Sequence, residues 1–204
     1  MPYFVNIVRT PKAGKTFEVL EAMKKAHAAA GQPGSITVPI SGSVPPRPSL
    51  VALISGFETL DDIDKFHNGY LANTEAQKRQ MALEELCDAN QLIVSEMLAG
   101  PEFSEGYEPE VVSRLHVPGI PGKIPELIDC LLEVREKVGG DAKNVVSRPL
   151  GGPITSLRVT TFGTSLQDLD DNRVETMKHL GKIPELLSGS PIRFLGRIVY
   201  RATA

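Results

Sequence analysis

The chain of 204 residues contains no tryptophan, two cysteines and few aromatic residues, which make up 5% of it. Cys87 and Cys130 both lie in stretches of helical periodicity beside apolar residues. We therefore expect no disulfide framework, and a reducing compartment is favoured. The amino-terminal residues lack a charged segment followed by an apolar run, so no signal peptide is expected. These features together predict a cytoplasmic protein.

Neither sign of charge dominates, because 22 Lys and Arg face 25 Asp and Glu, which gives a formal net charge of −3. This balance produces no general attraction to nucleic acid or to an anionic membrane. No apolar run approaches the roughly 20 residues that span a bilayer. With 41% hydrophobic residues, the composition is typical of a globular protein. We expect neither a nucleic acid nor a membrane as a partner.

Motifs for nucleotide, phosphate or metal binding are also lacking. Gly151-Gly152-Pro153 has no GxGxxG context, and no catalytic triad is recognisable. The four histidines show no ligand spacing and no CxxC occurs, so no metal site is expected. His27 and His179 fall in predicted helices, where a solvated or rim position is the plain interpretation.

What the sequence does contain is a pattern that recurs at a nearly constant offset. The matched segments are residues 14–20 with 122–128, 39–42 with 149–152, and 60–64 with 166–170. Each match is weak, but three in one order indicate a duplication. Small changes in the offset are what loop insertions produce, and residues 43–48 form one such insertion in the first copy.

Each half has the periodicity of a βαββαβ unit. In the first half we expect strands at residues 3–9, 36–40, 50–57 and 92–98, and helices at 15–30, 60–67 and 75–86. In the second half we expect strands at residues 111–117, 144–148, 156–161 and 192–201, and helices at 123–138 and 165–180. The helical region after residue 60 contains Asn68-Gly69, where we expect a break.

The predicted organisation is a first ferredoxin-like repeat at residues 1–98, a linker at 99–110 and a second repeat at 111–204. A four-stranded antiparallel sheet with two helices on one face leaves its other face bare. Two such sheets that face each other within one chain solve this problem. The expected fold class is therefore α+β, with two tandem units forming an intramolecular barrel.

The opening of the chain resembles that of the antibiotic-biosynthesis-monooxygenase-like proteins. The resemblance lies in Lys12-Ala13-Gly14-Lys15, the helix with Glu18, and Gln32-Pro33-Gly34 before a strand. It implies the dimeric α+β barrel superfamily, which NIPSNAP-like and EthD-like proteins share. Members include cofactor-free oxygenases, haem-degrading enzymes, isomerases, chlorite dismutase relatives and proteins without known activity, so the fold does not fix the function.

In the haem-degrading relatives an Asn of the first strand, a His of the second helix and a Trp act together. The resemblance carries the first two roles to Asn6 and His67, and the chain has no Trp. His67 is expected to end the first piece of a broken helix close to Tyr70, where a His and a Tyr could act as acid, base or hydrogen-bond anchor. We predict Asn6, His67 and Tyr70 as catalytic residues. A satisfied strand Asn and a His favoured by the helix dipole are the plain alternatives.

Arginine, and not lysine, occupies the predicted strands, mostly in the second half. Its planar, bidentate donors suit carboxylates and phosphates. We predict that Arg158, Arg197, His116 and Tyr200 bind the anionic group of a substrate. Charges that protect an edge strand, or ion pairs with Asp and Glu, are the alternatives.

These features predict a small-molecule enzyme resembling the cofactor-free monooxygenases, acting on a polar or anionic organic substrate. The alternative is a non-enzymatic, ligand-binding or stress-associated barrel, so whether the chain is an enzyme is left open. No bound cofactor is expected, with haem and flavin not excluded. The partner is a small-molecule ligand, and a homodimer beyond the intramolecular pair is left open.

Overall fold

A computed structural model describes residues 2–41, 49–138 and 140–202, which form two compact units. The predicted insertion at residues 43–48 lies outside the described residues. The first unit comprises Met1–Pro39, Ser43–Ser95 and Ile198–Ala204, and the second comprises Ile40–Gly42 and Glu96–Arg197. The last strand of each half therefore contributes residues to both units.

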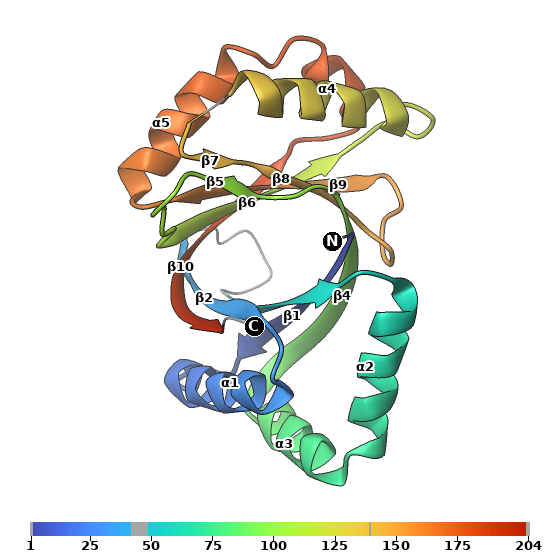
Figure 1. Ribbon diagram of the computed structural model, residues 1–204, viewed down its shortest axis with the longest axis vertical. Helices are drawn as coiled ribbons and strands as arrows, with labels where there is room; N and C mark the ends of the chain where they lie inside the picture. Colours follow the sequence, from blue (N-terminus) through green and yellow to red (C-terminus); the bar gives the residue numbers. More distant parts are fainter. Residues whose placement is uncertain (1, 42–48, 139, 203–204) are drawn as a thin grey trace. The chain divides into compact units, whose positions relative to one another are not determined.

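The first unit is an antiparallel sheet with three helices on one face (Figure 1). Its elements are β1 (Tyr3–Pro11), α1 (Thr16–Ala30), β2 (Gly34–Ser41), β3 (Leu50–Phe57), α2 (Leu60–Ala72), α3 (Thr74–Glu85) and β4 (Cys87–Ala99). The strand order is β4–β1–β3–β2. β1 pairs with β3 so that Asn6 lies opposite Leu53 and Arg9 opposite Leu50. The predicted strand at residues 50–57 is confirmed in full.

Alternation along the strands decides which side chains meet the helices. Val5 of β1 packs with Ile54 of β3 and Ile63 of α2 in one buried cluster. A second cluster joins α1 to β2 and β3, and its members include Val19, Met23, Ile36 and Ala52. The odd-numbered residues of β1 therefore face the helices, and the even-numbered residues point to the opposite face of the sheet.

The break between α2 and α3 lies at Asn73, and our prediction of a break near Asn68-Gly69 is wrong. Gly69 is tolerated inside α2 because glycine costs only about 1 kcal/mol there relative to alanine. Asn73 has an extended backbone, and its side chain accepts a hydrogen bond of 3.0 Å from the Ala76 amide. This is N-cap geometry, which ends one helix and begins the next. His67 accordingly lies within α2.

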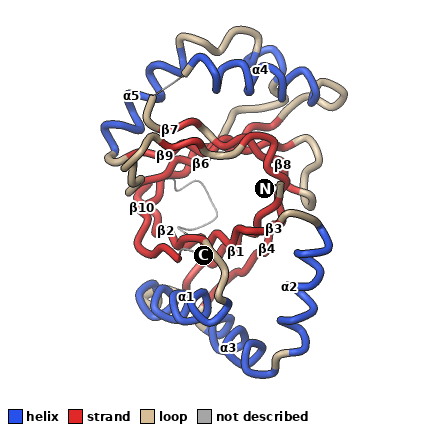
Figure 2. The backbone as a smooth tube through the Cα atoms, viewed as in Figure 1, coloured by secondary structure: helices blue, strands red, loops and turns tan. Residues whose placement is uncertain are grey.

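The second unit has the same order of main elements as the first (Figure 2). Its elements are β5 (Glu102–Phe103), β6 (Val111–Pro118), α4 (Ile124–Lys137), β7 (Ala142–Lys143), β8 (Val145–Pro149), β9 (Ser156–Gly163), α5 (Leu166–Met177), the 3₁₀ helix η1 (Ile183–Leu186) and β10 (Ile192–Ala202). The strand order is β10–β6–β9–β8. Val117, Leu127, Leu157 and Leu186 belong to a buried cluster between sheet, α4 and η1.

The segment at residues 99–110 holds β5, which pairs with β7. Arg135 of α4 fastens this segment, because its guanidinium donates to the carbonyl of Gly100 and to the carboxylate of Glu102, both at 2.8 Å. Its Nε also donates to the Asn144 carbonyl, at 2.8 Å. The segment thus packs as part of the second unit, while the predicted repeat boundaries stay a prediction. No helix in the described part of the chain is long and apolar enough to cross a membrane.

Candidate functional site

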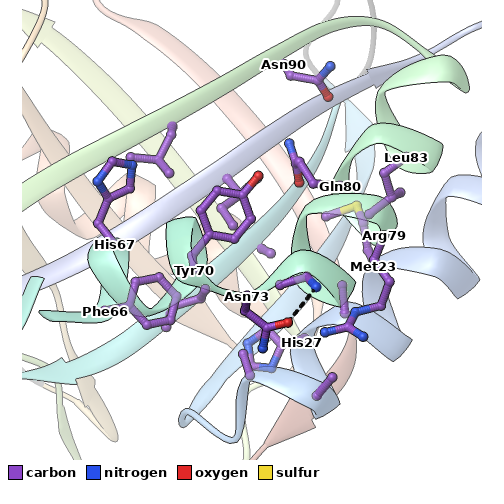
Figure 3. A pocket seen from close by; sticks show the side chains of 18 of the residues that line it. Met23, His27, Phe66, His67, Tyr70, Asn73, Arg79, Gln80, Leu83 and Asn90 are labelled. Atoms are coloured by element: carbon purple, nitrogen blue, oxygen red, sulfur yellow. Dashed lines mark hydrogen bonds between the residues drawn. The ribbon is translucent and has the colours of Figure 1, made fainter. Parts of the chain in front are cut away.

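A cavity of about 570 Å³ lies in the first unit between the sheet and its helices (Figure 3). Most of its walls are apolar, and they include Ile7, Met23, Ala26, Ile54, Phe66 and Leu83. The volume is within the range of about 300–1,000 Å³ that is usual for small-molecule sites. The polar groups among the lining residues come from β1, α1, α2, α3 and β4, so every layer of this unit contributes to the site.

Arg9 of β1 is a buried cation in the lining of this cavity, with 2% of its surface exposed. Its guanidinium donates to the Oδ1 of Asn90 at 2.6 Å and to the Oε1 of Gln80. It makes no ion pair within residues 2–41, 49–138 and 140–202. Burial lowers its pKa, and the charges of Cys87 and Glu84 partly oppose this change. An arginine nevertheless stays protonated, so two neutral amides and the side chain of Cys87 surround a full positive charge here.

The Gln80 amide connects Arg9 to an exposed carboxylate. While its oxygen accepts from Arg9, its Nε2 donates to Glu84 at 2.7 Å. Glu84 also lines the cavity. Gln80 therefore links Arg9 to the Glu84 carboxylate through two hydrogen bonds, and the two charged groups are not in direct contact.

His27 of α1 is also buried in the lining, with 4% of its surface exposed. Our interpretation of it as a solvated or rim residue is wrong. Its Nε2 lies 3.0 Å from the carbonyl oxygen of Leu53. Because a carbonyl only accepts, Nε2 carries the proton and the Nδ1 of the neutral ring is left as an acceptor. Within the described chain this buried Nδ1 has no hydrogen-bond partner.

The position of the His27 ring depends on Gly34. A Cβ at Gly34 would lie 1.9 Å from the Leu53 carbonyl oxygen and 2.8 Å from the His27 Nε2. Tyr200 packs on the ring edge-to-face, with centroids 5.4 Å apart. A missing side chain on one side and an aromatic ring on the other thus fix the imidazole beside the cavity.

His67 and Tyr70, two of the predicted catalytic residues, both line this cavity. Their rings lie 6.3 Å apart at an angle of 26° on one face of α2. In Figure 3 the Tyr70 hydroxyl points toward Gln80. The exposed side chains of Lys65 and Arg79 add positive charge to the same cavity.

Asn6, the third residue predicted to be catalytic, is buried on β1 but does not line this cavity. Its even position in the strand turns it to the face of the sheet that carries no helix. Arg9 occupies the helix-facing side of the same strand. The structure therefore brings two of the three residues together and places the third on the other face.

His116 and Arg158, from the predicted anion site, are direct cross-strand neighbours on β6 and β9. Burial, and then the charges of Arg158 and Arg114, lower the pKa of His116 to about 4. Burial, and then the charge of Arg114, lower the pKa of Arg158 to about 9. Their neighbours Val117 and Leu157 face α4, so this cluster lies on the opposite face of the second unit's sheet.

Arg197 and Tyr200 lie apart from that pair. Arg197 is opposite Val111 on β6 and forms an ion pair of 3.2 Å with Glu110 at the surface. Tyr200 belongs to the first unit, where it contacts His27. The four residues predicted to bind one anion are thus distributed over three places.

Sequence reasoning did not assign a role to Arg9, Gln80 or Asn90. One signal was present, because Arg9 is among the few charged residues in the predicted strands of the first half. The amide partners come from α3 and β4, and nothing local in their sequence indicates that they meet Arg9. Within the described residues no group of His, Cys, Asp and Glu is arranged to hold a metal ion.

Solved structures similar to the chain include an anthrone oxidase-like protein, with 18% identity, a TM-score of 0.68, and coverage of 98% of this chain and 92% of that one. A proposed monooxygenase of Fusobacterium nucleatum has 7% identity and a TM-score of 0.72, covering 99% and 94%. A haem-binding protein of Thermus thermophilus has 14% identity and a TM-score of 0.52, covering 98% and 91%. No protein-family model and no curated protein matches the chain.

The chain has the fold of the dimeric α+β barrel superfamily, and the predicted fold class is confirmed. The similar structures include monooxygenase-like and chlorite dismutase-like proteins. At such low identities the likeness defines a fold on which several chemistries are built. The reaction has to be argued from the cavity itself.

Proposed function

We propose that the chain is a monooxygenase-like enzyme that oxidises an apolar, ionisable organic molecule with O2 and without a bound cofactor. The observation that carries this proposal is that the cationic Arg9 and the imidazole of His27, whose Nδ1 has no hydrogen-bond partner in the described chain, line the same apolar cavity. A base and a buried positive charge are the two groups that help a weakly acidic carbon to lose a proton.

The reaction that suits these groups converts an activated methylene group into a carbonyl group. One methylene and one molecule of O2 become one carbonyl and one molecule of water, and the substrate supplies all four electrons. His27 Nδ1 accepts a proton from the methylene carbon, and the resulting carbanion transfers one electron to O2. The two radicals couple to a peroxide anion, which takes up the proton. Loss of water from the hydroperoxide then forms the carbonyl.

The other polar groups have supporting roles in this proposal. Arg9 supplies a fixed positive charge in the cavity, which stabilises the negative charge formed when the methylene group loses its proton. Tyr70 lines the same cavity, and its hydroxyl can donate a hydrogen bond to the substrate oxygen that receives this charge. The apolar walls keep water from the carbanion and its radical. The likeness to an anthrone oxidase-like protein supports a test with anthrone, whose methylene group lies between two aromatic rings.

The test is oxygen uptake by the purified protein with anthrone, after an absorbance spectrum has excluded bound haem and flavin. We expect anthrone-dependent uptake of one O2 per carbonyl formed. His27→Phe should lower kcat by about 100-fold or more, the usual contribution of a general base. His179→Gln, whose ring in the wild type pairs with Glu175 on another unit, is the control and should leave kcat unchanged. Absence of uptake above the buffer rate would overturn the proposal in favour of a ligand-binding barrel.

Haem binding is a second candidate, favoured by a separate set of residues in the same cavity. His67 is exposed there and its ring nitrogens make no hydrogen bond within the described residues, so it fits an iron ligand. Lys65 and Arg79 fit the two carboxylates of haem. When bound, haem would supply a redox-active iron. A haemin titration that gives a His67-dependent Soret band would support this candidate, and a spectrum equal to free haemin would exclude it.

A further inference from the structure

We infer that the Arg9 end of the cavity is a subsite for a planar carboxylate, so that the natural ligand is an organic acid with an apolar body. This inference rests on the proposed function for the identity of the site, and it deepens that function by naming the class of substrate. Binding of an acid is measurable without turnover, so the two proposals can fail separately.

Arg9 carries a buried positive charge that no carboxylate of the described chain contacts directly. A buried cation is strongly favoured by a directly bonded carboxylate, and leaving it without one is costly. Arg9 instead donates to the amide oxygens of Asn90 and Gln80, and it also hydrogen-bonds the side chain of Cys87, whose thiol pKa is raised by burial. These neutral acceptors solvate the guanidinium and fix its plane, but they leave its charge available to an incoming anion.

An incoming carboxylate can replace Gln80 as the acceptor of the Arg9 hydrogen bond. It is half-buried and it lines the cavity. Its amide nitrogen already bonds to the exposed Glu84. A carboxylate that takes the place of the Gln80 oxygen at Arg9 would gain a charge-assisted bond, while Gln80 keeps its second partner. Gln80 thus acts as a neutral placeholder for the anion.

A further support is the charge of the cavity as a whole. Its lining contains three permanent cations, Arg9, Lys65 and Arg79, and one carboxylate, Glu84. Two cations are exposed and one is buried. The exposed cations attract an acid to the opening of the cavity, and the buried Arg9 on the sheet binds it.

The shape and polarity of the walls favour a carboxylate over a phosphate. One wall of the cavity is apolar and has small side chains, because α1 contributes Ala26, Ala29 and Ala30. Leu83 of α3 forms a second apolar wall. Such walls accept a flat hydrocarbon body next to the acid. A single buried guanidinium matches the two oxygens of a carboxylate, whereas a phosphate has three oxygens to satisfy.

The experiment compares 2-naphthoate with its neutral, nearly isosteric analogue 2-naphthamide, by calorimetric titration of the full chain. We expect the acid to bind about tenfold or more tightly, because a hydrogen bond between two charged groups is about twice as strong as one between neutral groups. Arg9→Gln should reduce this preference to about one. Arg173→Gln, which removes an exposed arginine paired with Asp170, is the matched control and should retain the preference.

A second variant keeps the test decisive where Arg9→Gln fails to fold. Gln80→Ala retains Arg9 and removes the placeholder, so the affinity for 2-naphthoate should stay equal or rise. Equal binding of the acid and the amide to the wild type, or loss of acid binding in Gln80→Ala, would overturn the inference. Acid-selective binding without anthrone oxidation would refute the proposed reaction and leave the carboxylate subsite standing.

Discussion

Close contacts in the fold determine the charge state of some residues and the residue type that fits at other positions. The amino-acid composition does not reveal these contacts. His116 and Arg158 face each other across two strands, with Arg114 two positions along on the same face. Burial and the two guanidinium groups both oppose a further positive charge, which keeps His116 neutral. At Gly34 the lack of space requires a glycine, because the Leu53 carbonyl and the His27 ring occupy the place of a side chain.

Stability should fall in mild acid because of His116. The pKa of this residue is lowered from 6.5 to about 4 on folding, so the unfolded chain binds the proton first as the pH falls. The contribution is fully present above pH 6.5 and is lost between pH 6.5 and 4. Between about pH 7 and about pH 5 the loss should be about 2 kcal/mol. Urea unfolding of the wild type and His116→Gln at both pH values measures it, and equal pH dependence of the two proteins would contradict it.

Two glycines of the first unit should respond to alanine in opposite directions. Gly34→Ala forces a Cβ against the Leu53 carbonyl and should lower the free energy of unfolding by about 3 kcal/mol. Gly69→Ala, inside α2 with open space around it, should raise that free energy by about 0.5–1 kcal/mol. Denaturant unfolding of both variants checks the pair. A neutral Gly34→Ala would show that the strand shifts freely and that His27 is not fixed by this contact.

At the scale of elements, α3 depends on its first residues more than on burial. Leu83 is its one buried residue among those described, and most of the other residues of the helix are polar. The Asn73 side chain supplies a bond to the Ala76 amide at its start. Since α3 carries Gln80 and Glu84 into the lining of the cavity, the order of this helix determines how well both side chains are positioned.

Asn73→Ala should therefore destabilise the first unit by about 1 kcal/mol and speed amide exchange within α3. Asn73→Asp keeps an acceptor at the N-cap and is the matched control, with a change near zero. Hydrogen exchange read residue by residue separates this local effect from global unfolding. Unchanged exchange in α3 of Asn73→Ala would mean that tertiary contacts alone hold the helix.

The sequence predicted the elements better than the site, for physical reasons. Periodicity is local, so the strand at residues 50–57 could be read directly. The helix break was misplaced because Gly69 is a weak breaker and the Asn73 cap depends on backbone geometry. His67 was assigned through a family resemblance, and Tyr70 through its closeness to His67 at the expected helix break. Arg9 and His27 could not be assigned, since their partners lie in other elements of the unit.

At the scale of the whole molecule, the two halves share an order of elements but differ in their chemistry. The cavity with mixed cationic and apolar walls lies in the first unit, although most strand arginines belong to the second half. In the second unit Arg148 pairs with Glu96 and Arg197 with Glu110. Such paired arginines are of little use to a ligand.

Ligand binding should consequently stabilise the unit that holds the cavity. A saturating acid, at about 100 times its dissociation constant, should add about 2.7 kcal/mol to the free energy of unfolding. Thermal unfolding with 2-naphthoate measures this gain in the wild type and in His116→Gln, where it should persist. Arg9→Gln should show little gain. An equal gain in all three proteins would place the ligand elsewhere.

The close approach of Gly34 to His27 also helps to show which distant proteins of this fold are related in function. A helix residue and a glycine seven positions later, at the start of the next strand, can change only together if the ring is to stay in place. Arg9, with its acceptors Gln80 and Asn90, forms a second such linked set. Among distant barrels with the same fold, chains that retain both sets are expected to share this ligand, and chains that lose one set are expected to lose the other soon after.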